Sequence, residues 1–160
     1  MRIDLTPPEL AACHTAGVMR HLSARGGAVT DRQKGQQDKT QIDVDGVIAE
    51  YCFAKLANLC PDFTAHPRKG GADLVTRQGK TVDVKSTRHA SGRLLGDLKK
   101  PVDGACDLYV LMIVDDKGAT FAGWATYAEL FDDANLVDLG HGVVYALEQS
   151  RLRKWERVTA

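Results

Sequence analysis

The chain has 160 residues, of which 44% are hydrophobic and 26% are charged, and its 21 basic residues balance its 21 acidic ones. This length and composition predict one soluble globular domain, 1–160, with a core of its own. Zero net charge disfavours a basic protein that coats nucleic acid, but it suits an enzyme with carboxylates at its centre and cations around them. The longest apolar run, 108–114, is too short to cross a bilayer, and no apolar stretch follows a basic start.

Two helices are predicted in the first half of the chain. The first covers about 7–24 within the segment 1–27, because Thr6 and Glu9 form a capping box and Gly26 and Gly27 follow. The segment 28–42 is polar and predicts a loop. The second helix covers about 44–59, where apolar residues recur at helical spacing, and Pro61 ends it.

In the catalytic core predicted for 43–147, the hydrophobic period then changes to two, which indicates strands. Strands are expected at 72–76 and 80–87, joined by a turn at 77–79, and a short edge strand at 92–95. The continuous apolar run 107–114 predicts a central strand covered on both faces. A strand at 120–124, a short helix that begins with a capping box at Thr126, a strand at 143–147 and a basic amphipathic tail at 151–157 follow. This order predicts an α/β or α+β fold with a mixed central sheet flanked by helices.

The four cysteines show no metal-site or disulfide spacing. Cys13, Cys52, Cys60 and Cys106 contain no CxxC pair, and no histidine stands at an offset that completes a zinc site. We therefore expect small buried thiols in a reducing cytoplasm.

The predicted hairpin carries the residues with the clearest chemistry. Val82 and Val84 point to one face of their strand, and Asp83 and Lys85 point to the other. A three-residue turn that ends in a left-handed glycine places Asp73 opposite Asp83, whereas a two-residue turn would put Asp73 on the other face.

Two opposed carboxylates repel one another unless a cation lies between them, and oxygen ligands suit Mg²⁺, for which Mn²⁺ can substitute. A lysine beside the metal can orient or deprotonate a water that attacks phosphorus. Glu50, in the middle of the second predicted helix, has apolar neighbours and is expected to reach toward the metal. Two simpler interpretations stay open: Asp83 and Lys85 form an ordinary exposed ion pair, and Glu50 forms a salt bridge with a neighbour.

Two sequence motifs, Gly70-Gly-Ala-Asp-Leu74 and Val82-Asp-Val-Lys-Ser-Thr87, resemble the PD-(D/E)xK nuclease superfamily, which has the restriction-endonuclease-like fold. The resemblance covers about 44–125, with a glutamate on the helix before the hairpin, and the stretch 46–85 looks somewhat like archaeal Holliday-junction resolvases. Ala72 stands where the family pattern has proline, and the second acid is Asp. The QxxxY motif of RecB-type exonucleases does not follow Lys85.

The resemblance implies a Mg²⁺-dependent deoxyribonuclease. Asp73, Asp83 and the Val84 carbonyl would bind the metal, Glu50 would bind it directly or through water, and Lys85 would serve the attacking water. It implies DNA as the partner, allows a homodimer, and suits a phage or a prokaryotic host. The DNA-contact candidates around the hairpin are Arg68, Lys69, Ser86, Arg88 and Arg93.

Two other functions remain alternatives. The first is a catalytically inactive nuclease-fold module that binds DNA or a partner protein. The second is a structural or regulatory protein whose polar loop, 30–41, becomes ordered on a partner.

Overall fold

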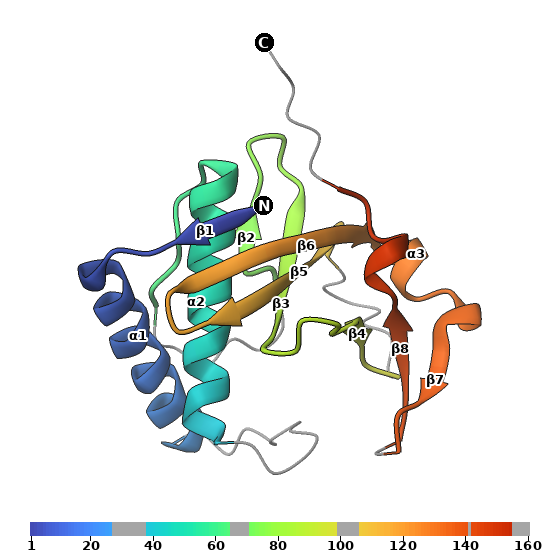
Figure 1. Ribbon diagram of the computed structural model, residues 1–160, viewed down its shortest axis with the longest axis horizontal. Coiled ribbons are helices and arrows are strands. Elements are labelled where there is room, and N and C mark those ends of the chain that lie inside the picture. Colours follow the sequence, from blue (N-terminus) through green and yellow to red (C-terminus); the bar gives the residue numbers. More distant parts are fainter. Residues whose placement is uncertain (27–37, 65–70, 99–105, 141, 155–160) are drawn as a thin grey trace.

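The computed structural model describes residues 1–26, 38–64, 71–98, 106–140 and 142–154 (Figure 1). It has the mixed helix-and-sheet architecture that the sequence predicts. The helical elements are α1 (Pro7–Gly26), α2 (Lys39–Ala57) and α3 (Tyr127–Leu130), together with single 3₁₀ turns at Asp133–Asn135 and Gln149–Arg151. None of the helices in these ranges is long and apolar enough to cross a membrane.

The larger sheet has five strands in the order β1-β6-β5-β3-β2. β3 and β5 run parallel, and every other neighbouring pair is antiparallel. As predicted, the apolar strand β5 is central, and its side chains are buried on both faces. The strands are β1 (Arg2–Asp4), β2 (Leu74–Val75), β3 (Thr81–Thr87), β5 (Leu108–Asp115) and β6 (Gly118–Thr126).

A second, three-stranded sheet follows the order β4-β8-β7. It consists of β4 (Leu94–Gly96), β7 (Leu136–Asp138) and β8 (Val143–Leu147). The sequence correctly predicts β4 within about two residues and β8 at its bounds, but it misses β7 and places all strands in one sheet. β7 has only three residues, too few for alternation to be visible before its partner β8 is known.

Two apolar clusters cover the two faces of the large sheet. On one face, α2 packs with Val47, Ile48 and Phe53 against Val82 and Val110 of the strands, and α1 packs against α2. On the other face, Tyr109 and Leu111 pack with Leu94, Phe131 and Leu147 from the second sheet and α3. Figure 1 shows α1 and α2 on one side of the large sheet and β7 and β8 on the other.

The boundaries near the N-terminus differ from those predicted. β1 is not expected from the sequence, because three residues form a strand here only by pairing with the long edge of β6, where Ile3 lies opposite Ala119. α2 begins at Lys39, so 39–42 are helical rather than part of a polar loop; Asp38 is the N-cap and accepts a hydrogen bond from the Thr40 amide. The rest of that predicted loop, 28–37, lies outside the described residues.

Four other local predictions can be compared with the structure. The capping box of Thr126 and Glu129 is present in full. Asn58, in the left-handed conformation, ends α2 before Pro61 is reached. Cys60 is exposed, in contrast to the predicted burial, whereas Cys13, Cys52 and Cys106 are buried and all four are free. The tail predicted at 151–157 forms a 3₁₀ turn and a short bridge up to Arg153, and its end, 155–157, is outside the described residues.

Candidate active site

The β2–β3 hairpin has the turn that the sequence predicts. The Thr76 amide donates to the Lys80 carbonyl at 2.8 Å, and the Gly79 amide donates to the Thr76 carbonyl at 2.9 Å. Three residues, 77–79, therefore close the hairpin, and Gly79 has a φ of +79°. Leu74 pairs with Val82 in this register, and Asp73 directly precedes the paired residues. The predicted pairing of Asp73 with Asp83 is therefore not part of the ladder.

The regular ladder between the two strands ends at Asp73. The Asp73 amide still donates to the Val82 carbonyl at 2.8 Å. In a continuing antiparallel ladder the Val84 amide would bond to the backbone of residue 72. It donates instead to Oδ2 of the Asp73 side chain, at 2.8 Å. The Asp73 carboxylate thus occupies the point where the edge strand leaves the sheet, beside the backbone of Val84.

Asp83 and Lys85 lie together on the face of β3 that points away from α2. Val82 and Val84 are buried with the α2 cluster. Asp83 is instead paired with Tyr109, and Lys85 with Leu111, two residues of the opposite apolar cluster. The Lys85 ammonium lies 2.9 Å from Asp83 Oδ2, with side-chain exposures of 44% and 22%. The predicted placement of these two side chains on one face is confirmed.

The charges of three carboxylates act on the Lys85 ammonium. Burial lowers the pKa of Lys85, but the ion pair with Asp83 and the charges of Asp73 and Asp97 outweigh burial, so the pKa is raised above its ordinary value. Lys85 is a cation in an ion pair with Asp83.

Sequence reasoning did not find Asp97. It follows β4 directly, and only the approach of the second sheet to the large one brings its charge near Lys85. An isolated aspartate after a three-residue strand carries no motif that would have identified it.

Asp107 is a second carboxylate that the sequence analysis did not identify, and it clamps the first residues of β3 to the start of β5. Its Oδ2 accepts hydrogen bonds from the amide and the hydroxyl of Thr81, and its Oδ1 pairs with Lys80 at 2.9 Å. The Thr81 amide and the Lys80 ammonium lower the pKa of Asp107 to about 2. Asp107 therefore supports the strand that carries Asp83, and it does so as an anion across the neutral pH range.

Glu50 belongs to the helix that covers the opposite face of the sheet. Both of its carboxylate oxygens lie 2.9 Å from Arg20 Nη1 of α1, and this pair is largely buried, with side-chain exposures of 17% for Arg20 and 13% for Glu50. Arg20 also donates to the carbonyls of Asp62 and Thr64. The salt bridge that the sequence analysis left as an alternative for Glu50 is therefore present, and it ties α1, α2 and the segment after α2 together.

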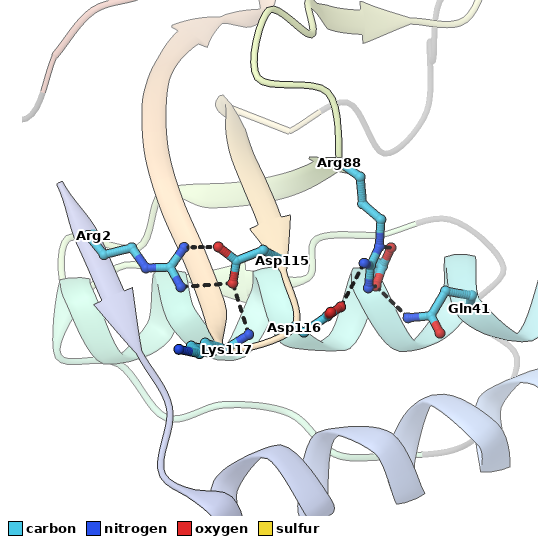
Figure 2. A network of polar contacts seen from close by, with 7 residues as sticks. Arg2, Gln41, Arg88, Asp115, Asp116 and Lys117 are labelled. Carbon is cyan, nitrogen blue, oxygen red and sulfur yellow. Dashed lines mark hydrogen bonds and ion pairs between the residues drawn. The ribbon is translucent and has the colours of Figure 1, made fainter.

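Two of the basic DNA-contact candidates around the hairpin form ion pairs with acidic residues. Arg88 is held by acids: it donates to Asp45 from Nε and Nη2 and to Asp116 from Nη1, at 2.7–2.8 Å. Figure 2 shows this guanidinium between Asp116 and the N-terminal part of α2, where Gln41 joins the network by donating to Asp45. Arg93 pairs with Glu148 at 2.7 Å.

Ser86 continues β3 beyond Lys85 and is partly buried. Arg68 and Lys69 lie outside the described residues.

The donor set fits a hard divalent cation in its chemistry. Asp73, just before β2, and Asp83, on β3, offer carboxylate oxygens, and Val84 next to Asp83 offers its carbonyl. Mg²⁺ and Mn²⁺ accept both kinds of ligand. Within the described ranges, no group of three or more His, Cys, Asp or Glu side chains stands close enough to hold a metal. The set is therefore two carboxylates and a lysine, with Glu50 bound to Arg20 instead.

Comparisons of this chain with models of protein families, with curated proteins and with solved structures give no match.

Proposed function

We propose that this protein is a metal-dependent nuclease that hydrolyses DNA phosphodiester bonds at the centre formed by Asp73, Asp83 and Lys85. The observation that supports the proposal is the arrangement at the β2–β3 hairpin, where the Asp73 carboxylate accepts a hydrogen bond from the Val84 amide and Asp83 pairs with Lys85. Neighbouring carboxylates with an adjacent ammonium are the donor set for a hard cation and an anionic substrate. The residues that resemble the PD-(D/E)xK pattern are the same three, and we propose a cytoplasmic setting, in which the buried thiols stay reduced.

In this mechanism Asp73 and Asp83 would hold the metal, and the Val84 carbonyl would be a further ligand. A bound Mg²⁺ or Mn²⁺ supplies Lewis-acid stabilisation of the charge that develops on the phosphoryl oxygens. Lys85, which lies 2.9 Å from Asp83, would orient the attacking water and attract the phosphate.

The first experiment titrates Mg²⁺ and Mn²⁺ against the purified protein by calorimetry, beside the Asp73→Asn/Asp83→Asn double variant. Asp138→Asn is the matched control, because it removes an exposed carboxylate from β7 in the second sheet. Metal binding is expected in the wild type and the control and lost in the double variant. Equal binding by all three proteins would place the metal elsewhere and contradict the proposal.

The second experiment incubates the same proteins, and the single variants Asp83→Asn and Lys85→Ala, with linear, nicked and branched DNA. Each single variant is expected to lose cleavage while circular dichroism shows that the fold survives. A variant of either residue that cleaved as fast as the wild type would refute the assigned mechanism.

The pairing of Glu50 with Arg20 favours a second candidate, a nuclease-fold module that binds DNA or a partner without cleaving. A catalytic centre of this kind usually needs its carboxylates at the metal, whereas here Glu50 is bound by a guanidinium. Metal-independent DNA binding with no cleavage of any substrate would support the module. Loss of cleavage in a folded Glu50→Gln variant would instead support the enzyme with Glu50 as a participant.

A further inference from the structure

A hollow of about 380 Å³ lies at the end of the large sheet where the hairpin turns. It is enclosed by the last turn of α2, the turn between β2 and β3, the start of β5, and Trp124 of β6. Its walls are mainly apolar, with Phe53 and Val110 buried and Leu59, Leu108 and Trp124 around them. Its volume and lining fall within the range of sites that bind small molecules.

The aromatic wall is held in place. Arg153 lies over the Trp124 ring, 5.0 Å from its centroid, and donates from Nε and Nη2 to Glu129. Trp124 and Arg153 also exchange backbone hydrogen bonds at 2.8 and 3.0 Å. Since one side of the indole is covered by a guanidinium with its own acidic partner, the ring presents a fixed apolar surface to the hollow.

The mouth of the hollow carries a guanidinium that is not neutralised by any of the described residues. Arg77 and Gln78 of the hairpin turn line it. The neighbouring cations Lys80 and Arg153 are neutralised by Asp107 and Glu129. In the described parts of the chain, no carboxylate pairs with Arg77. An apolar, aromatic cavity with one such guanidinium at its rim is complementary to an aromatic ring that carries an anionic group.

We propose that this hollow binds one unpaired nucleobase of a DNA strand, with the base against Trp124 and Arg77 on the phosphate of the same nucleotide. The assignment to DNA rests on the proposed nuclease function. The hollow lies on the α2 face of the large sheet, where its lining residues Phe53 and Val110 are buried, whereas Asp83 and Lys85 lie on the other face. The β2–β3 hairpin is the edge of this sheet, so it separates the hollow from the carboxylates. A DNA strand that crosses this edge would have one nucleotide at the hollow and others toward the carboxylates.

The test measures binding without cleavage. Trp155→Phe leaves Trp124 as the sole tryptophan of the chain. Its fluorescence is titrated, in metal-free buffer, with a short single-stranded oligonucleotide and with deoxyadenosine monophosphate. Saturable quenching by the oligonucleotide is expected, and Arg77→Gln should weaken it about tenfold, because one charge-assisted phosphate contact is lost. Lys117→Gln removes the same charge from the β5–β6 turn, at the opposite end of β5, and is expected to leave binding unchanged.

A second variant tests the cavity apart from the charge. Ala57→Phe fills the hollow from α2 without altering the charge, and it should abolish the quenching in a protein that circular dichroism shows to be folded. No saturable quenching by the oligonucleotide, or equal loss in Arg77→Gln and Lys117→Gln, would overturn the proposal. So would equal affinity for the mononucleotide, which would assign the hollow to a free nucleotide. Because metal is absent, failure here leaves the cleavage result intact, and failure of cleavage does not alter this binding measurement.

Discussion

Replacing Gly79 by alanine tests whether the hairpin turn sets the register of the candidate site. Gly79 has a φ of +79°, and a Cβ added to it meets nothing within 4 Å, so the substitution is opposed by backbone conformation alone. A non-glycine residue in the left-handed region costs about 1–2 kcal/mol. The stiffer unfolded chain offsets about 0.4–1 kcal/mol of this cost. We therefore expect Gly79→Ala to lower the free energy of unfolding by about 1 kcal/mol, and the melting temperature by about 2–4 °C for a chain of this size.

Alanine substitutions at two other glycines provide comparisons for this prediction. Gly46 lies inside α2, where an added Cβ also meets nothing within 4 Å, and its φ is not positive. Gly46→Ala should therefore stabilise the protein by about 0.5–1 kcal/mol. At Gly118, with a φ of +151°, a Cβ would lie against the Ile3 carbonyl oxygen, so its alanine variant should lose the most stability, with β1 detached from β6. The three variants are compared by urea denaturation monitored by circular dichroism. A Gly79→Ala protein as stable as the wild type would refute the turn and the register derived from it.

Three further predictions concern stability and reactivity. Arg88→Ala leaves Asp45, which is 8% exposed, without two charge-assisted hydrogen bonds. Because the Arg88 side chain is 42% exposed, we expect the free energy of unfolding, measured by urea denaturation, to fall by about 1.5–3 kcal/mol. A decrease below about 0.5 kcal/mol would contradict the structural role of Arg88. The pKa of Asp107 is lowered to about 2 in the folded state, so its contribution to stability is present at neutral pH and is lost as the pH falls from about 4 to about 2. Asp107→Asn should therefore flatten the acid-unfolding curve in that window, and an unchanged curve would argue against the clamp. A maleimide should label only Cys60 within the first minutes at neutral pH, because Cys60 is exposed whereas burial raises the pKa of the other three thiols to about 11–12. Fast labelling that persists in Cys60→Ser would show that one of the buried thiols is reactive.

Local signals in the sequence were enough for much of the fold. The capping box at Thr126, the continuous apolar run of β5 and the glycine of the hairpin turn each have a physical cause within a few residues of the chain. The three-residue turn follows from such a local rule. Asp83 and Lys85 were correctly placed on one face, because the side-chain period of a strand is two.

Other features depend on contacts between segments far apart in the sequence. β1 and β7 are strands only because β6 and β8 offer edges to them. The partition into two sheets depends on how β4 and β8 fold over the face of β5.

The candidate site divides in the same way. The sequence by itself determined the hairpin, its turn and the face shared by Asp83 and Lys85, since these depend on alternation and on one left-handed glycine. The tertiary structure decided that Glu50 pairs with Arg20, that Arg88 pairs with Asp45 and Asp116, and that the charge of Asp97 acts on Lys85. A charged side chain that is withdrawn from water needs an opposite charge nearby. Which residue supplies that charge depends on the packing of helices and strands that are distant in the sequence.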